Sequence, residues 1–325
     1  MAAELEIESA LAAVRSASEL CSGAQGRLAA GDTLTKGDES PVTVADFASQ
    51  AVVCAALTDA LGPIDMVGEE DSDDLRNDGR TALREGVVAL VRHQLGDDVS
   101  ESSVIDLISV GSADGRSDRY WTLDPIDGTK GFLRGEQYAI ALALIERGEV
   151  LLGVLGCPNL PNPDGTTGAL FVATPGSCVA YYGSSTQALP IRVAAPASVA
   201  EARFCESVES GHSNQDDSAR IASLLGISAE PYRIDSQCKY AAVARGDASI
   251  YLRLPTRADY REKIWDHAAG KFVVEQAGGR VTDVTGAPLD FTHGPKLEQN
   301  RGIVATDGQF HDEVIAAVTT VLSST

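Results

Sequence analysis

The sequence predicts an α/β (α+β) fold, because three patterns follow one another along the chain. Apolar residues recur at helical spacing near the N-terminus, and extended apolar runs separated by turn residues fill the middle. From about residue 194 onward, strands alternate with helices, which argues for a second α/β layer. We therefore expect an α+β part over residues 1–193 and an α/β part over residues 194–325. A chain of 325 residues is long enough to bury a substantial core.

The first third of the chain is predicted to be mainly helical. Helical spacing of apolar residues over 4–30 indicates one long helix. Thr43 followed by an acid at Asp46 is typical of a helix start, and this second helix should extend through Leu61. A short strand is expected over 64–67.

An acidic and polar stretch follows over residues 71–118. Within it, only residues 81–95 have a helical pattern. We interpret the stretch as an insertion that lies over or beside a functional site.

The middle of the chain is predicted to form β-hairpins. Residues 138–145 and 150–155 flank a Glu-Arg-Gly-Glu turn, and residues 169–174 and 177–182 flank a Pro-Gly turn. Residues 158–168 are rich in Pro, Gly and Asn, and we expect a surface loop there.

The last part of the chain should alternate between strands and helices. The expected strands cover 204–208, 232–234, 248–252 and 302–305. The expected helices cover 216–225, 239–245, 264–276 and 311–321.

Composition excludes several classes of partner. The formal net charge is −21, so a nucleic-acid polymer is a poor candidate, since binding its backbone needs a basic surface. We find no apolar run that approaches the length of a membrane span, and expect no membrane partner. The acidic N-terminus lacks the features of a secretory or organellar leader, which predicts a cytoplasmic protein. Six cysteines without zinc spacing are expected to be buried free thiols.

The segment Trp121-Thr122-Leu123-Asp124-Pro125-Ile126-Asp127-Gly128-Thr129-Lys130-Gly131-Phe132 is the most informative in the chain. An apolar strand leads into two carboxylates, Asp124 and Asp127, and Pro125 stiffens the turn between them. Carboxylates hold hard cations, and the free N–H groups of the following Gly128-Thr129 helix start can hold a phosphate. Metal and phosphate in one loop suggest phosphoryl chemistry.

Three further segments carry acids in similar surroundings: Pro41-Val42-Thr43-Val44-Ala45-Asp46, Val67-Gly68-Glu69-Glu70-Asp71 and Trp265-Asp266-His267-Ala268-Ala269-Gly270. Each acid alone is more often a helix cap or an exposed turn residue. Together they form the carboxylate set that a two-metal phosphatase site needs.

The order and wording of these four segments resemble the lithium-sensitive, magnesium-dependent phosphatases related to inositol monophosphatase, over about residues 36–305. This resemblance implies a layered α-β-α-β-α sandwich and two or three Mg²⁺ ions. It implies that one ion is held by Glu70, Asp124 and the Ile126 carbonyl. It implies that a second is held by Asp124, Asp127 and Asp266. It further implies that Asp46 and the Thr129 hydroxyl activate water, and that the N–H groups of Gly128 and Thr129 hold the scissile phosphate.

The ending Gly-Thr-Lys-Gly-Phe resembles the bisphosphate nucleotidase branch of this family, because inositol monophosphatases usually carry Asn where this chain has Gly131. The segments 206–213, 235–240 and 251–255 also resemble that branch. By this resemblance, the nucleotide site is lined by His212, Ser236, Lys239 and Arg253. Lys and Arg side chains are suited to a phosphate that is not cleaved.

The resemblance implies hydrolysis of adenosine 3′,5′-bisphosphate to AMP and phosphate, and of 3′-phosphoadenylyl sulfate, with a role in sulfate assimilation. It also implies inhibition by Li⁺ and Na⁺, a small nucleotide bisphosphate as the partner, and a monomer. Two enzyme alternatives stay open, an inositol polyphosphate 1-phosphatase and an enzyme with both activities. From other classes, a catalytically silent nucleotide sensor and a ligand-free acidic structural protein stay open.

Overall fold

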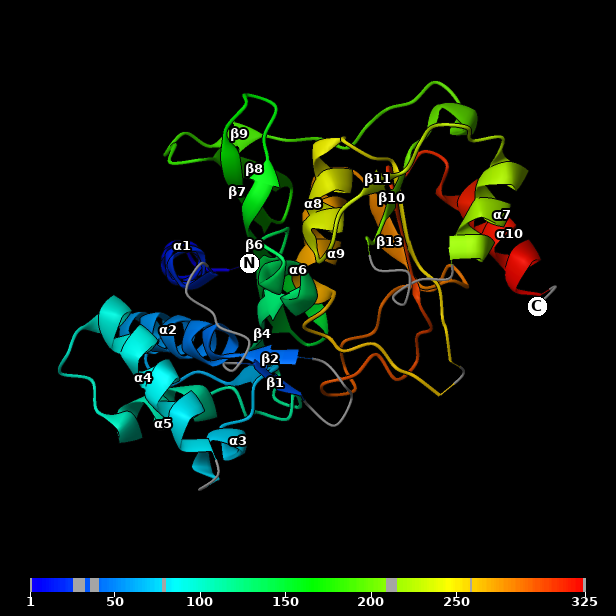
Figure 1. The fold of residues 1–325 in the computed structure, drawn as a ribbon. Helices are drawn as coiled ribbons and strands as arrows, with labels where there is room; N and C mark the ends of the chain where they lie inside the picture. Colours follow the sequence, from blue (N-terminus) through cyan, green and yellow to red (C-terminus); the bar gives the residue numbers. More distant parts are fainter. Residues whose placement is uncertain are drawn as a thin grey trace.

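The computed structural model describes residues 2–25, 33–35, 41–77, 80–208, 215–257 and 259–323. Its elements stack in the order helix, sheet, helix, sheet, helix (Figure 1). The three helical layers are the pair α1 (Glu4–Gln25) and α2 (Val44–Leu61), the pair α8 (Cys238–Arg245) and α9 (Ala268–Gln276), and the pair α7 (Gln215–Leu225) and α10 (His311–Leu322). This arrangement confirms the predicted sandwich.

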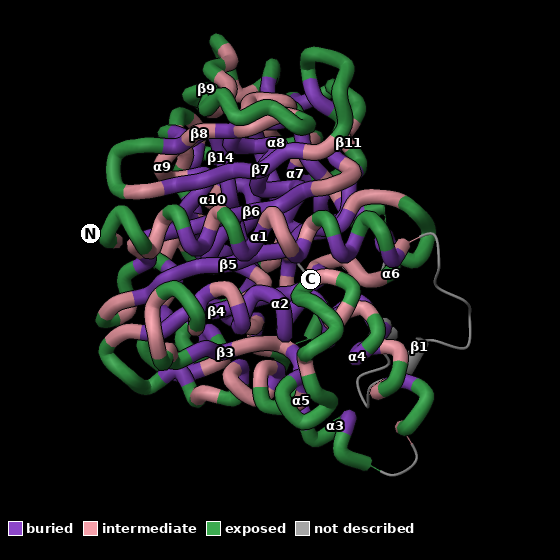
Figure 2. Tube along the Cα trace, turned by 90° about the vertical axis from the view of Figure 1, so that its left-hand side faces the viewer, coloured by how far each residue is buried: buried purple, intermediate pink, exposed green. Residues whose placement is uncertain are grey.

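The larger sheet has seven strands in sequence order. They are β3 (Met66–Gly68), β4 (Arg119–Asp127), β5 (Ala139–Glu146), β6 (Glu149–Pro161), β7 (Thr167–Thr174), β8 (Ser177–Tyr182) and β9 (Leu189–Pro190). Only the β3–β4 pair is parallel. Figure 2 shows the mostly buried strands stacked from β3 to β9, with α1 crossing in front of them.

Both predicted hairpins are confirmed, but the predicted surface loop over 158–168 is wrong in its bounds. Pairing between β6 and β7 continues through an irregularity to Pro161 and Thr167. The connection is therefore short, because the Pro/Gly/Asn-rich stretch is mostly paired strand.

The smaller sheet has five strands in the order β11-β10-β12-β14-β13. They are β10 (Phe204–Glu206), β11 (Tyr232–Arg233), β12 (Ile250–Arg253), β13 (Arg280–Thr282) and β14 (Ile303–Thr306). The pairs of β10 are parallel, whereas those of β14 are antiparallel. The three-residue β13 was not predicted. A separate two-stranded sheet joins β1 (Thr33–Thr35) to β2 (Pro41–Thr43), and a 3-10 turn, η3, covers Val199–Glu201.

The insertion holds three helices, α3 (Asp73–Arg76), α4 (Thr81–Leu95) and α5 (Glu101–Ser109). The bounds of α4 are those predicted. Helix α5 was not predicted, although Ser100 caps it by accepting a hydrogen bond from the Ser103 N–H, and Val104 and Ile108 are fully buried at helical spacing. Helices α4 and α5 both pack against α2, so the insertion lies beside the N-terminal helical layer.

Helix α2 is apolar almost all round, and this changes one expectation. Its 18 residues have a mean hydropathy of 1.4, so the prediction that no run reaches membrane-spanning length is wrong on length. However, 72% of the segment is buried inside the protein, between α1, α4, α5 and β4. An apolar core helix passes the same length test, and a helix hydrophobic all round is expected where it is surrounded by other elements.

One helix bound differs from the prediction by more than one residue, and another falls outside the described residues. The first helix is described from Glu4 to Gln25, and its predicted end over residues 26–30 lies outside the described part of the chain. Helix α9 begins at Ala268 instead of residue 264, because residues 264–267 form a turn closed by the His267 N–H and the Ile264 carbonyl.

One hydrophobic core joins the two predicted parts of the chain. It packs strands β5 to β8 against α8, α9 and the smaller sheet. The division at residue 193 stays a prediction about folding units. All six cysteines lie in the described chain, buried and free as expected.

Candidate active site

The acidic end of β4 contains one extra residue. Asp124 pairs with Ala141 and Asp127 with Ala139, so three steps along β4 oppose two steps along β5. Successive side chains of a regular strand alternate between its faces, so residues three apart would point in opposite directions. The extra residue is a bulge that changes this parity, and it allows Asp124 and Asp127 to serve one site.

Asp124 is the most deeply placed of these acids, with an exposed fraction of 2%. Burial raises its pKa well above the usual range, and the neighbouring charges of Glu69, Asp127 and Asp266 raise it further. Its Oδ1 atom has no hydrogen-bond partner within the described residues. Burial and Asp266 also raise the pKa of Asp127 to about 6, although Lys239 and Arg253 act in the opposite direction.

This donor set fits a hard divalent cation. Several carboxylates that repel one another and an unsatisfied buried oxygen are the surroundings that Mg²⁺ or a similar ion would stabilise. Without such an ion, burial and then mutual repulsion favour the protonated carboxyl groups, which is why their pKa values rise.

The structure brings Glu69, rather than the predicted Glu70, against Asp124. Strands β3 and β4 are parallel with Gly68 opposite Leu123, so Glu69 is level with Asp124. The Glu69 N–H donates to the Leu123 carbonyl at 3.1 Å, and the carboxyl groups of Glu69 and Asp124 share a hydrogen bond. Glu70 is buried with an exposed fraction of 3%. Adjacent extended residues point to opposite sides. Only the register of β3 against β4 therefore shows which of the two acids meets Asp124.

Helix α2 presents one face to this site. Asp46 lies in its first turn and is buried, with an exposed fraction of 2%. One turn later, the Ser49 hydroxyl donates to the Pro125 carbonyl at 2.9 Å. Residues at i, i+3 and i+4 share a helix face, so Asp46 lies on the same face as Ser49 and as Gln50, which hydrogen-bonds the Glu70 backbone. The helix start was predicted, whereas the contacts of Ser49 and Gln50 were not.

The Gly128-Thr129 turn meets the C-terminal half of the chain. Gly128 has a φ of 88°, a left-handed conformation that favours glycine. A Cβ atom there would lie 2.8 Å from the Ser236 Cβ. The Thr129 hydroxyl donates to the Ile126 carbonyl at 3.3 Å. The hydroxyl predicted to activate water and the carbonyl predicted to bind a metal ion are therefore adjacent.

Segment 235–239 supplies the neighbours of Asp127. The Gln237 N–H donates a short hydrogen bond to the Asp127 Oδ2. Lys239 is buried, its Nζ lies 5.3 Å from the Tyr251 ring centroid, and Asp127 attracts its charge. Burial lowers the pKa of Lys239, while Asp127 partly offsets this effect. Ser236 adopts a φ of 65° and donates to the Asp235 carbonyl at 2.5 Å.

Asp266 lies just before α9, close to a buried charge network. The Arg253 Nη2 is 3.7 Å from the Asp266 Oδ2, and its Nε is 2.8 Å from the Glu262 Oε2. Burial acts to raise the pKa of Glu262, but Arg253 and His267 together lower it to about 2. The ligand atoms of Glu262, Asp266 and His267 lie within 4.8 Å of one another. Arg253 pairs with both acids, so its single positive charge offsets part of their combined negative charge and helps to hold the cluster together.

Two residues singled out in the sequence have further partners in this network. Arg253, whose contact with substrate phosphate stays a prediction, pairs with two carboxylates of its own chain. His267, expected to serve the helix start, is the N-cap residue of α9, and its ring lies 2.8 Å from the Tyr240 hydroxyl and 3.2 Å from Glu262. The predicted His212 lies outside the described residues.

Gln237 is a site residue that sequence reasoning missed. Besides its N–H contact with Asp127, its side-chain Nε2 donates to the Trp265 carbonyl at 2.9 Å, and its Oε1 accepts from the Gly270 N–H at 3.1 Å. One residue thus holds Asp127, the residue before Asp266 and the first turn of α9. A single glutamine in the sequence carries no pattern that would indicate such a role.

Comparison with known proteins was consistent with this geometry. The profile of the inositol monophosphatase family matches residues 4–323. A 3′(2′),5′-bisphosphate nucleotidase from Schizosaccharomyces pombe is 43% identical, over 99% of this chain and 97% of that protein. One from Oryza sativa is 46% identical, over 96% and 93%. Among solved structures, a Thermotoga maritima IMPase aligns over 97% of this chain and 96% of its own, with a TM-score of 0.65 and 23% identity. This last likeness concerns the fold.

Proposed function

This chain belongs to the inositol monophosphatase family, and on that premise we propose that it is a Mg²⁺-dependent 3′(2′),5′-bisphosphate nucleotidase. It hydrolyses adenosine 3′,5′-bisphosphate to AMP and phosphate. The observation that carries the proposal is the carboxylate cluster of Asp124, Asp127 and Asp266, with the buried cation Lys239 beside it. Full-length relatives named for this activity support it.

Oxygen ligands on three segments of the chain would hold the metal ions. Glu69, Asp124 and the Ile126 carbonyl form one group, with Glu69 in the place first given to Glu70. Asp124, Asp127 and Asp266 form the other. When bound, Mg²⁺ ions neutralise charge on the phosphate and make a water molecule more acidic. The number of ions, two or three, is part of the proposal.

The protein's own groups direct the displacement at phosphorus. Asp46 and the Thr129 hydroxyl orient the attacking water, and the Asp46 carboxylate accepts its proton. The water oxygen bonds to phosphorus, and the bond from phosphorus to the 3′-oxygen of the ribose breaks. The departing 3′-oxygen takes up one proton, equal to the one removed from the water, and AMP leaves with a 3′-hydroxyl. The N–H groups at Gly128 and Thr129 donate to the phosphate oxygens, since the first amides of a helix have no partner within it.

Lys239 supports binding of the phosphate that is not cleaved. A buried ammonium group attracts a dianionic phosphate strongly, because little water screens it. Ser236, Arg253 and His212 complete the proposed nucleotide side. Arg253 reaches the phosphate while it keeps its contacts with Glu262 and Asp266, since a guanidinium has five N–H donors.

Further properties belong to the same proposal. These are hydrolysis of 3′-phosphoadenylyl sulfate, a role in sulfate assimilation, inhibition by Li⁺ and Na⁺, a monomeric state and a cytoplasmic location. Sedimentation of the purified protein tests the monomer, and microscopy of a tagged chain tests the location.

The deciding experiment measures phosphate release from adenosine 3′,5′-bisphosphate and from inositol 1,4-bisphosphate in parallel, with Mg²⁺ and with or without Li⁺. We expect release from the nucleotide that requires Mg²⁺ and is blocked by Li⁺. The Lys239→Met variant should raise KM for the nucleotide while Mg²⁺ dependence stays unchanged. Release from the inositol compound alone would reject the nucleotide assignment, and no release from either would reject the proposed chemistry.

A further inference from the structure

The side chain of Gln50 is fully buried and holds the peptide groups on both sides of Glu70. Its Oε1 accepts from the Glu70 N–H at 3.1 Å, and its Nε2 donates to the Glu70 carbonyl at 2.7 Å. The second hydrogen of Nε2 goes to the Ile108 carbonyl at 3.0 Å. Both amide donors and one acceptor position are therefore used, between α2, the end of β3 and α5.

Two glycines leave room for this amide. A Cβ atom on Gly68 would lie 2.5 Å from the Gln50 Oε1, and one on Gly111 would lie 2.4 Å from its Nε2. The same two glycines are joined, because the Gly68 N–H donates to the Gly111 carbonyl at 2.8 Å. The amide thus occupies a slot whose walls are the backbone before Glu69 and the backbone after α5.

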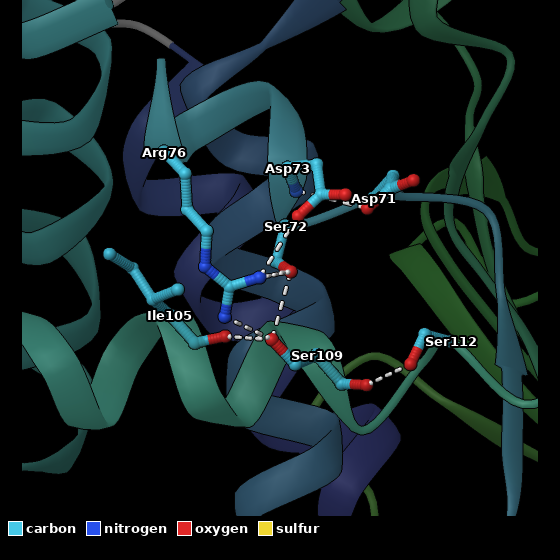
Figure 3. Close-up of polar contacts among 7 residues, drawn as sticks. All are labelled: Asp71, Ser72, Asp73, Arg76, Ile105, Ser109 and Ser112. Atoms are coloured by element: carbon cyan, nitrogen blue, oxygen red, sulfur yellow. Dashed lines mark hydrogen bonds and ion pairs between the residues drawn. The ribbon is translucent and has the colours of Figure 1, made fainter. Parts of the chain in front are cut away.

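The end of α5 is held from a second side as well. Arg76 donates to the Ser72 hydroxyl at 3.0 Å and to the Ser109 hydroxyl at 3.1 Å, and these two hydroxyls lie 2.8 Å apart (Figure 3). Ser72 is two residues from Glu70, and Ser109 follows Ile108. Segment 69–72 and the end of α5 are therefore joined both by Gln50 and by this Arg-Ser network.

We propose that Gln50 is a positioning residue that, with the α5 end of the insertion, holds the Glu69–Glu70 segment in place for metal binding. This inference rests on the metal site of the proposed function. It gives residues 71–118 a defined task, because Ile108 and Gly111 supply the far wall of the slot. Without the amide, the Glu69 carboxylate loses its fixed approach to Asp124.

The test compares Gln50→Met with a matched control, Asn162→Leu. Asn162 is also a buried amide that donates two hydrogen bonds, to Thr166 and Gly168, and accepts one from Arg245, but it lies in the β6–β7 connection. Mn²⁺ binding to the metal-free proteins is followed by the EPR signal of free Mn²⁺. Phosphate release from adenosine 3′,5′-bisphosphate is then measured against Mg²⁺ concentration.

We expect Gln50→Met to bind Mn²⁺ about 10- to 100-fold more weakly, the range typical of groups that orient metal ligands. The Mg²⁺ concentration for half-maximal rate should rise by the same factor, with kcat at saturating Mg²⁺ changed only a few-fold. Asn162→Leu should keep the wild-type Mn²⁺ affinity even if its melting temperature falls as much as that of Gln50→Met. Unchanged Mn²⁺ binding by Gln50→Met overturns the inference and leaves the proposed function standing.

A second variant keeps the test decisive if Gln50→Met does not fold. Gly111→Ala retains Gln50 but forces its amide to shift, and we expect about 10-fold weaker Mn²⁺ binding, the lower end of the same range. Wild-type Mn²⁺ affinity in a folded Gly111→Ala protein argues against the role of the insertion. If the wild-type chain itself binds no Mn²⁺, the proposed metal site fails and the inference with it.

Discussion

Asp127→Asn should stabilise the metal-free protein at neutral pH while it removes activity. Burial and the nearby charge of Asp266 raise the pKa of Asp127 from its ordinary value of 3.8 to about 6. The ionised carboxylate is therefore a source of strain in the folded state whenever no metal is bound. An asparagine oxygen can still accept the Gln237 N–H hydrogen bond, so the substitution removes mainly the charge.

The size of the effect follows from the pKa difference. About two pKa units at about 1.36 kcal/mol each correspond to about 3 kcal/mol. This is an upper value, because Asp127 is partly exposed and solvent screens some of the repulsion. Because the folded-state pKa is raised, the stability that protonated Asp127 contributes to the fold is fully present below pH 3.8. It is lost as the pH rises through about 6.

Urea unfolding in the presence of EDTA tests this reasoning at a series of pH values. We expect Asp127→Asn to be more stable than wild type by up to about 3 kcal/mol at pH 7.5, with the difference vanishing near pH 4. Saturating Mg²⁺ should reverse the order, because only the wild type binds the ion fully. The exposed Asp97→Asn serves as the control, with no expected change. A metal-free Asp127→Asn protein less stable than wild type at pH 7.5 would refute the electrostatic argument.

Three further outcomes are expected. Gly131→Asn should lower the free energy of unfolding by about 1–3 kcal/mol in urea titrations, because its Cβ would lie 2.3 Å from the Gln137 carbonyl; full stability would contradict this steric account. Thr129→Val should reduce kcat for adenosine 3′,5′-bisphosphate about 100-fold with little change in melting temperature, and an unchanged kcat would remove the hydroxyl from the mechanism. Gln237→Leu leaves the half-buried Trp265 carbonyl and the buried Gly270 N–H without their partner, so calorimetry should show a loss of about 2–4 kcal/mol, and a neutral effect would contradict the bridging role.

The acid-bearing segments and most secondary structure were predictable from local patterns. Residues 81–95 form a helix with the predicted bounds, and the turn at 146–149 connects two strands as expected. Asp46 lies in the first turn of its helix, where an acid is favoured. These features depend on helical period, strand length and turn chemistry, which act between residues close in sequence.

Local patterns failed where an element is short or held by distant partners. Strand β13 has three residues and takes its place from pairing with β14. Residues 264–267 belong to an apolar helical pattern but form a turn, since Asp266 and Trp265 are tied to Arg253 and Gln237 on other elements.

By itself the sequence determined which segments carry the clustered carboxylates, the acidic loop after β4 and the class of chemistry that they suggest. The tertiary structure alone decided which acid of the Gly-Glu-Glu segment meets Asp124, because that choice depends on the register of β3 against β4. It also decided that Arg253 pairs with Glu262 and that the Gln50 side chain hydrogen-bonds the backbone of Glu70. These contacts join residues up to 58 positions apart, as between Gln50 and Ile108, and no periodic pattern within one segment encodes such a distance.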